Sequence, residues 1–366
     1  MNTYPTKLVE AFALQALEIF YMTSVSEGIT NNDYEGLIEN KSSKVNILTF
    51  GAISTHAYTG ADMTADDLTE SNAQLVTDQA KYVYFTIKSY DKFRSFIKDP
   101  ENPVAKQVAS EIKKVIDVYV LGLYGDAGSG NWLGTSYATG TVEVTVTTGA
   151  VTGDGTTFVA SMVGKPFKAN GHTVWYRIKS RSGNTAIVIE DDSDDLTSAY
   201  TGGAIVAGAT FEIQGNTAYA ITSANVFSQF IEMQTVLTNQ EVPEEDRWAV
   251  VPARAAALIR QAPEYTGSGQ VEGGREAVMN GALPRKFAGF TVYEVSDARI
   301  SGDRTNGYHV MAGHKSAITF AMGLTENGVE DAIGNFGKRV KQLYVYGAKV
   351  ADERRKALVH ALWSVA

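Results

Sequence analysis

The sequence of 366 residues contains no cysteine, so neither a disulfide framework nor a thiolate metal site exists. No apolar run approaches the roughly 20 residues that a membrane-spanning helix needs. The N-terminus lacks a charged segment followed by a clean apolar core, so we do not expect a signal peptide. The net charge of −9 argues against nucleic-acid binding through phosphate neutralisation, although a protein that only encloses nucleic acid stays possible.

Catalytic signatures are also missing. We find no phosphate-binding GxxxxGK[ST] loop, no HExxH, no GxSxG and no CxxC. The five histidines form no i, i+4 pair, and we interpret them as structural or exposed: His56, His172, His309, His314 and His360. We therefore expect no catalytic residues, no cofactor, no metal and no enzymatic activity.

Two short stretches resemble binding sites only superficially. Four acidic residues, Asp191, Asp192, Asp194 and Asp195, would suit a hard cation, but the glycine and distant glutamate of a calcium loop are absent. We interpret this acidic run as a solvated turn. Gly125 to Gly130, GDAGSG, has the glycine content of a phosphate loop, but it follows a helix rather than a strand.

The most regular stretch is a long amphipathic helix over 101–124. Asn102 is a suitable N-cap and Pro103 fits the first helical position. Apolar residues recur at steps of three and four and share one face: Val104, Val108, Ile112, Val115, Tyr119 and Leu123. We expect a rigid rod to which the other parts attach.

Before this helix, the sequence predicts an arm and a hairpin. Residues 7–24 have a helical apolar stripe, and a polar arm follows to 43. Residues 44–59 and 73–88 are rich in β formers, and the segment between them is acidic. We expect two long strands joined by a charged tip.

After the helix, residues 137–213 are dense in Thr, Val and Gly, with alternating runs and frequent turn signals. We interpret them as an inserted all-β sandwich or barrel. The rest predicts an α/β block: a helix capped by Ser223, a strand at Trp248–Val251, helices at 253–261 and 315–323, and strands at 289–295 and 308–311. Two final strands flank a basic turn at Arg354 to Lys356.

The order of these parts resembles the major capsid proteins of tailed bacteriophages, which have the Hong Kong 97-type fold. The specific segments are EVPEEDRWAVVPARAAALI (241–259), GFTVYEVSDARI (289–300), YHVMAGHKSAITFA (308–321) and FGKRVKQLYVYGAKV (336–350), with a looser match at LVTDQAKYVYFTIKSYD (75–91). The likeness covers roughly 1–125 and 216–366. It implies an α+β fold with an additional all-β domain.

The resemblance also implies a division of the chain. Residues 1–43 would be the N-terminal arm and 44–88 the extended loop. The peripheral domain would comprise 89–136 and 330–366, with the long helix as its spine. Residues 137–215 would be the inserted β domain, and 216–329 the axial domain, which meets its copies around the symmetry axes.

The implied function is self-assembly into the icosahedral head that encloses phage DNA. The implied partners are copies of the chain as pentamers and hexamers, a portal, a decoration protein and, because the chain begins near the arm helix, a separate scaffolding protein. Assembly would occur in the host cytoplasm, and the product would be the virion capsid. No membrane or sequence-specific DNA contact is expected.

One inter-subunit contact follows from charge. The acidic tip, Asp62, Asp66, Asp67 and Glu70, would meet a basic patch on the next subunit. The candidate partners are Lys113 and Lys114 on the spine, or the tail-turn residues Arg354, Arg355 and Lys356.

Three alternatives stay open at this stage. An encapsulin-like nanocompartment has the same shell fold, but the large β insert disfavours it. A virion surface or host-binding protein would act through the insert. An enzyme with an unrecognised site would show a pocket with convergent titratable groups.

Overall fold

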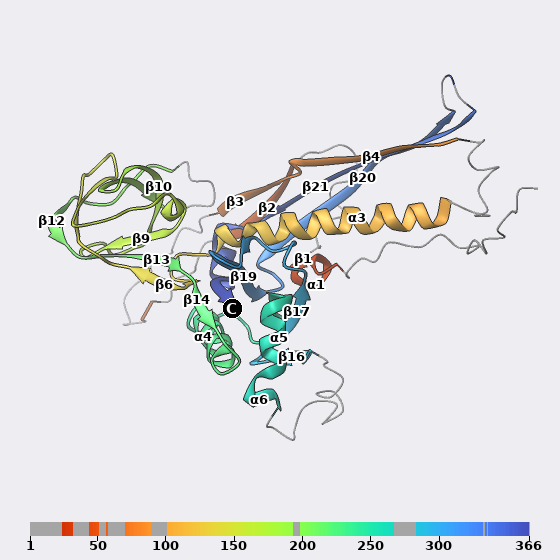
Figure 1. Ribbon diagram of the computed structural model, residues 1–366. Helices are drawn as coiled ribbons and strands as arrows, with labels where there is room; N and C mark the ends of the chain where they lie inside the picture. Colours follow the sequence, from red (N-terminus) through yellow and green to blue (C-terminus); the bar gives the residue numbers. More distant parts are fainter. Residues whose placement is uncertain are drawn as a thin grey trace, which may run out of the picture.

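The computed structural model describes residues 24–31, 44–50, 56–57, 70–88, 101–192, 198–266, 283–331, 334 and 336–365. Figure 1 shows three parts around the long helix α3 (Glu101–Leu121). We call them the insert, an all-β lobe at one end of the helix; the body, a mixed α/β part below it; and the tongue, a long sheet that runs alongside it. No helix of the described ranges is both long and apolar enough to cross a membrane.

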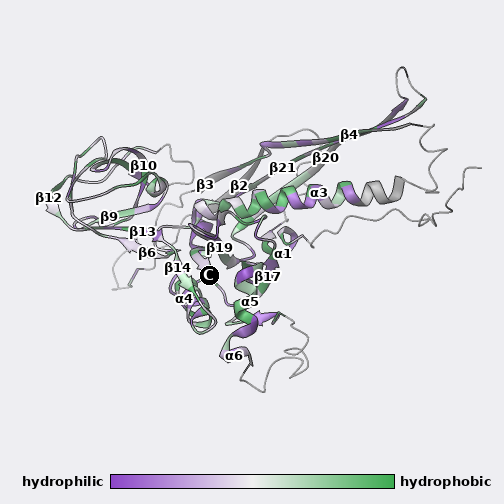
Figure 2. Cartoon of the chain, in the orientation of Figure 1, coloured by the Kyte–Doolittle hydropathy of each residue, from purple (hydrophilic) through white to green (hydrophobic). Residues whose placement is uncertain are grey.

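Helix α3, which we also call the spine, confirms the long helix predicted from periodicity. It begins at Glu101, slightly before the predicted cap, and passes into a 3-10 turn, η2 (Gly122–Asp126). Ile112, Ile116 and Val120 are buried at steps of four, which places them in one row facing the body. Figure 2 shows hydrophobic and hydrophilic positions alternating along the helix. Asp117, a charged residue of the same helix, is also fully buried.

The body is built on a mixed sheet of order β14-β22-β19-β15-β17-β16, with β5 and β18 paired at its margins. Its strands are β5 (Trp132–Leu133), β14 (Tyr219–Ile221), β15 (Arg247–Pro252), β16 (Lys286–Phe287), β17 (Phe290–Val295), β18 (Gly302–Asp303), β19 (Gly307–His314) and β22 (Leu358–Val365). The short 3-10 turn η4 (Asp352–Ala357) precedes β22. This arrangement confirms the predicted strand at Trp248 and the strand–turn–strand end of the chain.

Helices pack on the body sheet: α4 (Val226–Asn239), α5 (Ala253–Gln261) and the short α6 (Pro263–Thr266). From α4, the buried side chain of Phe230 meets Trp363 edge to face, with ring centroids 5.6 Å apart. The predicted cap at Ser223 is wrong. Helix α4 begins at Val226, and Asn225 precedes it, accepting a hydrogen bond from the Thr222 N–H through its side-chain oxygen at 2.7 Å.

The tongue is a four-stranded sheet of order β1-β20-β21-β4. Its strands are β1 (Thr30–Asn31), β20 (Ile318–Asp331), β21 (Gly337–Lys349) and β4 (Gln79–Lys88), and the short helix α1 (Ser26–Ile29) precedes β1. The helix predicted at 315–323 is therefore wrong. A short apolar run does not distinguish a buried strand from a helix, and here β1 and β21 pair on either side of Ile318–Thr319.

The predicted hairpin is half right. β2 (Lys44–Phe50) pairs antiparallel with β3 (Glu70–Val76), but residues 79–88 leave it and pair with β21 as β4. The chain changes partner at Thr77–Asp78. It passes so close to β21 that a Cβ on Gly347 would collide with the Val76 carbonyl oxygen. Between β2 and β3 the structure describes only residues 56–57, so the acidic tip up to 69 lies outside it, as does the helix predicted at 7–24 apart from its last residue.

The insert is an eight-stranded sheet of order β12-β7-β8-β11-β10-β9-β13-β6, curled around its own hydrophobic cluster. Its strands are β6 (Thr135–Tyr137), β7 (Thr141–Val144), β8 (Ala150–Asp154), β9 (Pro166–Ala169), β10 (Tyr176–Gly183), β11 (Ala186–Asp191), β12 (Ile205–Ala209) and β13 (Phe211–Thr217), with a 3-10 turn η3 at Ala160–Met162. The predicted all-β character is confirmed. The exact division of the chain into domains stays a prediction.

Candidate functional site: the tongue and the insert–body junction

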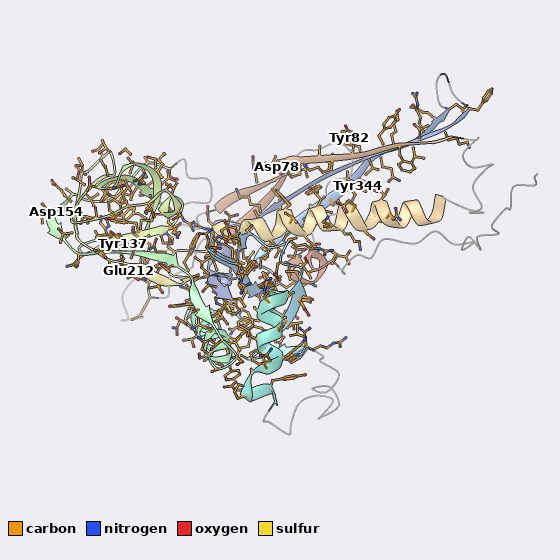
Figure 3. All side chains as sticks on the ribbon, viewed as in Figure 1. Asp78, Tyr82, Tyr137, Asp154, Glu212 and Tyr344 are labelled. Carbon is orange, nitrogen blue, oxygen red and sulfur yellow. The ribbon has the colours of Figure 1, made fainter. Side chains whose placement is uncertain are left out.

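The tongue presents an aromatic surface and an open edge. Along β4 the exposed Tyr82 (77%) and Tyr84 (52%) alternate with the half-buried Val83 and Phe85. Tyr82 lies along the upper edge of the tongue in Figure 3. Within the described ranges, β4 pairs only with β21, so its outer backbone edge has no strand partner. Open edges and exposed aromatic faces are surfaces that accept another chain.

A tyrosine on the spine holds the base of the tongue. The Tyr119 hydroxyl donates to Asp78 Oδ1 at 3.0 Å and accepts from the Ala348 N–H at 3.4 Å. Its ring meets Tyr346 edge to face, with centroids 5.4 Å apart. Burial, with a smaller contribution from Asp78, raises the pKa of Tyr119 to about 12, so the hydroxyl keeps its proton and remains a donor. The point where the chain leaves the hairpin is thus attached to α3.

Asp117 joins three distant segments of the chain. Its carboxylate accepts hydrogen bonds from the Ser24 hydroxyl at 2.8 Å and the Ser26 N–H at 3.1 Å, and it pairs with Arg299 Nη1 at 2.8 Å. Both charged side chains are almost fully buried. A buried pair of this kind is retained only where hydrogen bonds satisfy its remaining oxygens. Nothing in the helical periodicity distinguishes Asp117 from a solvated residue, so our sequence reasoning missed it.

The predicted contact residues lie in several places. Lys113 pairs with Glu27 at 2.8 Å and Lys114 with Glu111 at 3.4 Å, all on exposed surface. Arg354 donates to the Ser316 hydroxyl at 2.9 Å. Lys356 is exposed, Glu70 begins β3 with its side chain outside the described residues, and Asp62, Asp66 and Asp67 fall outside them entirely. The contact between acidic tip and basic patch stays a prediction.

Arg355 differs from its two neighbours because it is buried within the chain. Its Nη2 binds Asp192 Oδ1 at 2.5 Å, its Nη1 binds the Asp192 carbonyl at 3.0 Å, and its Nε donates to the Asp126 carbonyl at 3.1 Å. Only 6% of its side chain is exposed. Since Asp192 follows β11 of the insert and Arg355 belongs to η4, this contact fastens the insert to the body.

A second arginine completes the junction from the insert side. Arg177, on β10, binds Asp192 Oδ1 through Nε at 2.7 Å. Its Nη1 and Nη2 donate to the carbonyls of Gly125 and Ala127, both at 2.6 Å. The guanidinium also lies over the Trp132 ring, 5.3 Å from its centroid. The GDAGSG stretch therefore supplies carbonyl acceptors to an arginine.

The acidic run is therefore only partly a solvated turn. Burial by itself would raise the pKa of Asp192, but the charges of Arg177 and Arg355 outweigh burial and lower it. The carboxylate is 19% exposed and stays ionised at neutral pH. Asp191 accepts from the Thr201 hydroxyl at 2.7 Å, whereas Asp194 and Asp195 lie outside the described residues.

Two of the histidines form a pair beside this junction. His309 Nδ1 and His360 Nε2 lie 2.8 Å apart, and Tyr124 stacks on His309 with ring centroids separated by 4.0 Å. Burial, reinforced by nearby cations, lowers the pKa of His309 to about 4 and that of His360 well below its usual value. Both imidazoles are neutral at pH 7 and pack as aromatic groups. Over the described ranges, no three metal-ligating side chains cluster as a metal site would require.

Comparisons of sequence find no matching family model and no matching curated protein. Comparison of the structure is decisive for the fold. A structure from Mycobacterium phage Che8 matches with a TM-score of 0.61 at 17% identity, covering 98% of this chain and 97% of the other. This chain has the Hong Kong 97-type capsid fold.

Two further capsid structures support the assignment. That of cyanophage P-SCSP1u matches with a TM-score of 0.58 at 11% identity, over 98% of this chain and 94% of its own. That of cyanophage Pam1 matches with a TM-score of 0.56 at 13% identity, over 99% of both chains. These matches span the insert as well as the capsid-fold core, and at such low identity they establish the fold alone.

Proposed function

We propose that this chain is a major capsid protein that assembles with copies of itself into the icosahedral head of a phage. The observation that carries the proposal is the capsid fold, which extends over nearly the whole chain. The role is structural rather than catalytic. The product would be the virion capsid, assembled in the cytoplasm of the host.

The exposed tongue supports the proposal on physical grounds. Shell subunits need large contact areas, on the order of thousands of Å² for permanent assemblies. The tongue supplies such area from little mass, because its central strand β21 is half-buried over most of its length and Tyr82 and Tyr84 stand exposed on β4. A neighbouring copy of the chain would cover this surface.

On the basis of the capsid fold, we also assign a role to each part of the chain. Residues 44–88 would form the extended loop over a neighbour, 1–43 the arm, 89–136 with 330–366 the peripheral domain, 137–215 the inserted domain and 216–329 the axial domain. The acidic tip, including Glu70, would contact Lys113 and Lys114 or the exposed Arg354 and Lys356 of the next copy. Arg355 is committed to Asp192 of its own chain, so we assign it no inter-subunit role.

We further propose the partners with which such a head would assemble. A separate scaffolding protein would guide assembly, a portal would occupy one vertex, and a decoration protein would be an optional addition. The net charge of −9 would weakly repel enclosed DNA, so that the genome is held without sequence-specific contacts.

Assembly of the purified chain tests the proposal directly. We expect velocity sedimentation and negative-stain electron microscopy to show icosahedral particles, or rings of five and six subunits, with or without a scaffolding protein. Tyr82→Glu and Tyr84→Glu together should abolish these species, because each places a charge on the tongue surface. A matched variant, Val206→Glu, alters an equally exposed residue (81%) on the insert and should leave assembly intact. A stable monomer under all conditions would overturn the proposal.

A further inference from the structure

A pocket lies between the insert and the body, beside the arginine junction. Its volume is about 470 Å³, within the range typical of small-molecule sites. The insert contributes Val163, Lys165 and Arg177, and the other side contributes Tyr124, Trp132 and His309. The cavity is thus lined by aromatic rings on one side and by cationic groups on the other.

Lys165 is the unusual member of this lining. The residue is only 7% exposed, yet its ammonium makes one hydrogen bond, to the Asn216 carbonyl at 3.1 Å. Among the described residues, no carboxylate oxygen lies within 4.0 Å of its Nζ. An ammonium has three N–H donors, so two are left for the cavity. Buried charges are normally paired, and a buried cation without an anion is costly.

The other cations of the junction do not share this property. Arg177 is held by Asp192 and by the carbonyls of Gly125 and Ala127. Asp126 also lines the cavity, and its charge acts on Arg177. Burial alone lowers the pKa of Lys165 to about 8, with no compensating effect from Asp126 or Asp192. The uncompensated positive charge is therefore localised at Lys165.

His309 supplies a second donor at the same place. The Nδ1 atom of buried His360 has no hydrogen-bond partner, and a buried acceptor without a partner is tolerated better than a buried N–H without one. We therefore assign the proton of His360 to Nε2, from which it is donated to His309 Nδ1. His309 then carries its own proton on Nε2, the nitrogen that remains for the cavity.

We propose that this cavity is a binding site for a small oxyanion, a phosphate or carboxylate group, received by the Lys165 ammonium and the His309 imidazole N–H. The volume allows a small organic body on the anion, which would lie against Tyr124 and Trp132. The bound anion would also join the insert to the body, because its donors come from both. This inference does not depend on the proposed shell role.

The test measures the titration of Lys165 in the unaltered chain. Trace acylation with acetic anhydride, read by mass spectrometry as a function of pH, reports the midpoint of each lysine. Without phosphate, Lys165 should titrate near pH 8. Millimolar inorganic phosphate should raise that midpoint by about one pH unit, which corresponds to about tenfold tighter binding to the protonated form. Sodium chloride at equal ionic strength should not.

Lys168 is the internal control. It lies on β9, which begins just after Lys165, but it donates to the Thr173 carbonyl and lies over Trp175, away from the cavity. Its midpoint should not respond to phosphate. Equal shifts at Lys165 and Lys168, or no shift at Lys165, would overturn the proposal. In a second measurement, phosphate should raise the Tm of the unaltered chain and of Lys168→Met, but not that of Lys165→Met; an undiminished rise in Lys165→Met would contradict it.

Discussion

The insert and the tongue are both all-β parts of one chain, yet they bury their residues in opposite ways. The insert has eight strands and encloses a cluster in which Phe158, Phe167 and Ile213 have no exposed surface. The tongue has four strands and mostly half-exposed side chains, with Tyr82 and Tyr84 in solvent. The insert buries its apolar side chains within itself, whereas the tongue leaves aromatic side chains exposed that another chain could cover.

The two regions are also attached differently. The insert is fastened by buried charges, Asp192 with Arg177 and Arg355. The tongue is continuous with the body through β20, and the spine holds its base through Tyr119. The insert has its own core and is attached through buried charges, whereas the tongue lacks a complete core and is attached through its backbone. Mutations in the two regions should therefore have different effects on stability and on assembly.

The largest contrast should come from two aromatic truncations. Phe167→Ala, in the insert core, should lower the free energy of unfolding by about 3 to 5 kcal/mol because it leaves a buried cavity. Tyr82→Ala, on the tongue, should change it by less than about 0.5 kcal/mol in the unassembled chain, yet weaken assembly. Urea denaturation and sedimentation of both variants measure the two effects. A Tyr82 variant that is as unstable as the Phe167 variant would invalidate the comparison.

The charged joint provides the next effect. Asp192→Ala leaves two buried guanidinium groups without their carboxylate, and we expect a loss of about 3 kcal/mol. The loss should appear as separation of the insert, detected by faster proteolysis around 125–135, before the insert itself unfolds. Asp154→Ala, at an exposed position on β8, is the matched control and should behave like the unaltered chain. Identical proteolysis of both variants would argue against a fastening role for Asp192.

Acid should act on the buried pair of His309 and His360 beside the junction of insert and body. His309 has a pKa of about 4 in the folded chain and 6.5 in the unfolded one, so the unfolded state binds the proton first. The free energy of unfolding therefore has its full value, as far as His309 is concerned, above pH 6.5. It falls as the pH decreases from 6.5 to about 4, by up to about 1.4 kcal/mol per pH unit. Denaturation of the His309→Gln variant should show a shallower decline over this window. An unchanged slope would assign the acid response to other groups.

The smallest effect should be on the spine surface. Lys113→Glu breaks an exposed pair with Glu27 and should cost the unassembled chain less than about 1 kcal/mol. If the acidic tip contacts this site on a neighbour, a Lys113→Glu/Lys114→Glu double variant should assemble more slowly, and the difference should diminish as salt is added. Light scattering during assembly follows both. Assembly indifferent to the change and to salt would leave the fold contrast intact but eliminate this contact.

Sequence patterns predicted regular elements well and partner choice poorly. The period of α3 and the alternation in the insert are local signals, and both elements form as predicted. The helix expected at 315–323 failed because Ile318 to Ala321 is buried on both faces, which removes the alternation typical of a strand. The exchange of partners at Thr77–Asp78 depends on where β21 lies, more than 250 residues later.

The candidate sites also differ in how far the sequence predicted them. The β formers of β4 were recognisable as a strand, but the strand with which it pairs was not. The buried carboxylates were not, because Asp117 and Asp192 look like ordinary surface residues until the arginines that neutralise them, Arg299 and Arg355, arrive from elsewhere in the chain. A charge run shows which residue types are present, whereas the pairing depends on tertiary structure.

The strand pairing also determines the order in which the parts can fold during synthesis. β1 pairs with β20, β4 with β21, and β5 with β22, so early segments wait for the last strands of the chain. At the pace of a ribosome, that wait lasts on the order of tens of seconds. Among the described residues, the strands of the insert pair only with one another, so the insert is free to fold during translation. During translation the insert can therefore be folded while the tongue is not, because the tongue sheet cannot form before β20 and β21 have been synthesised.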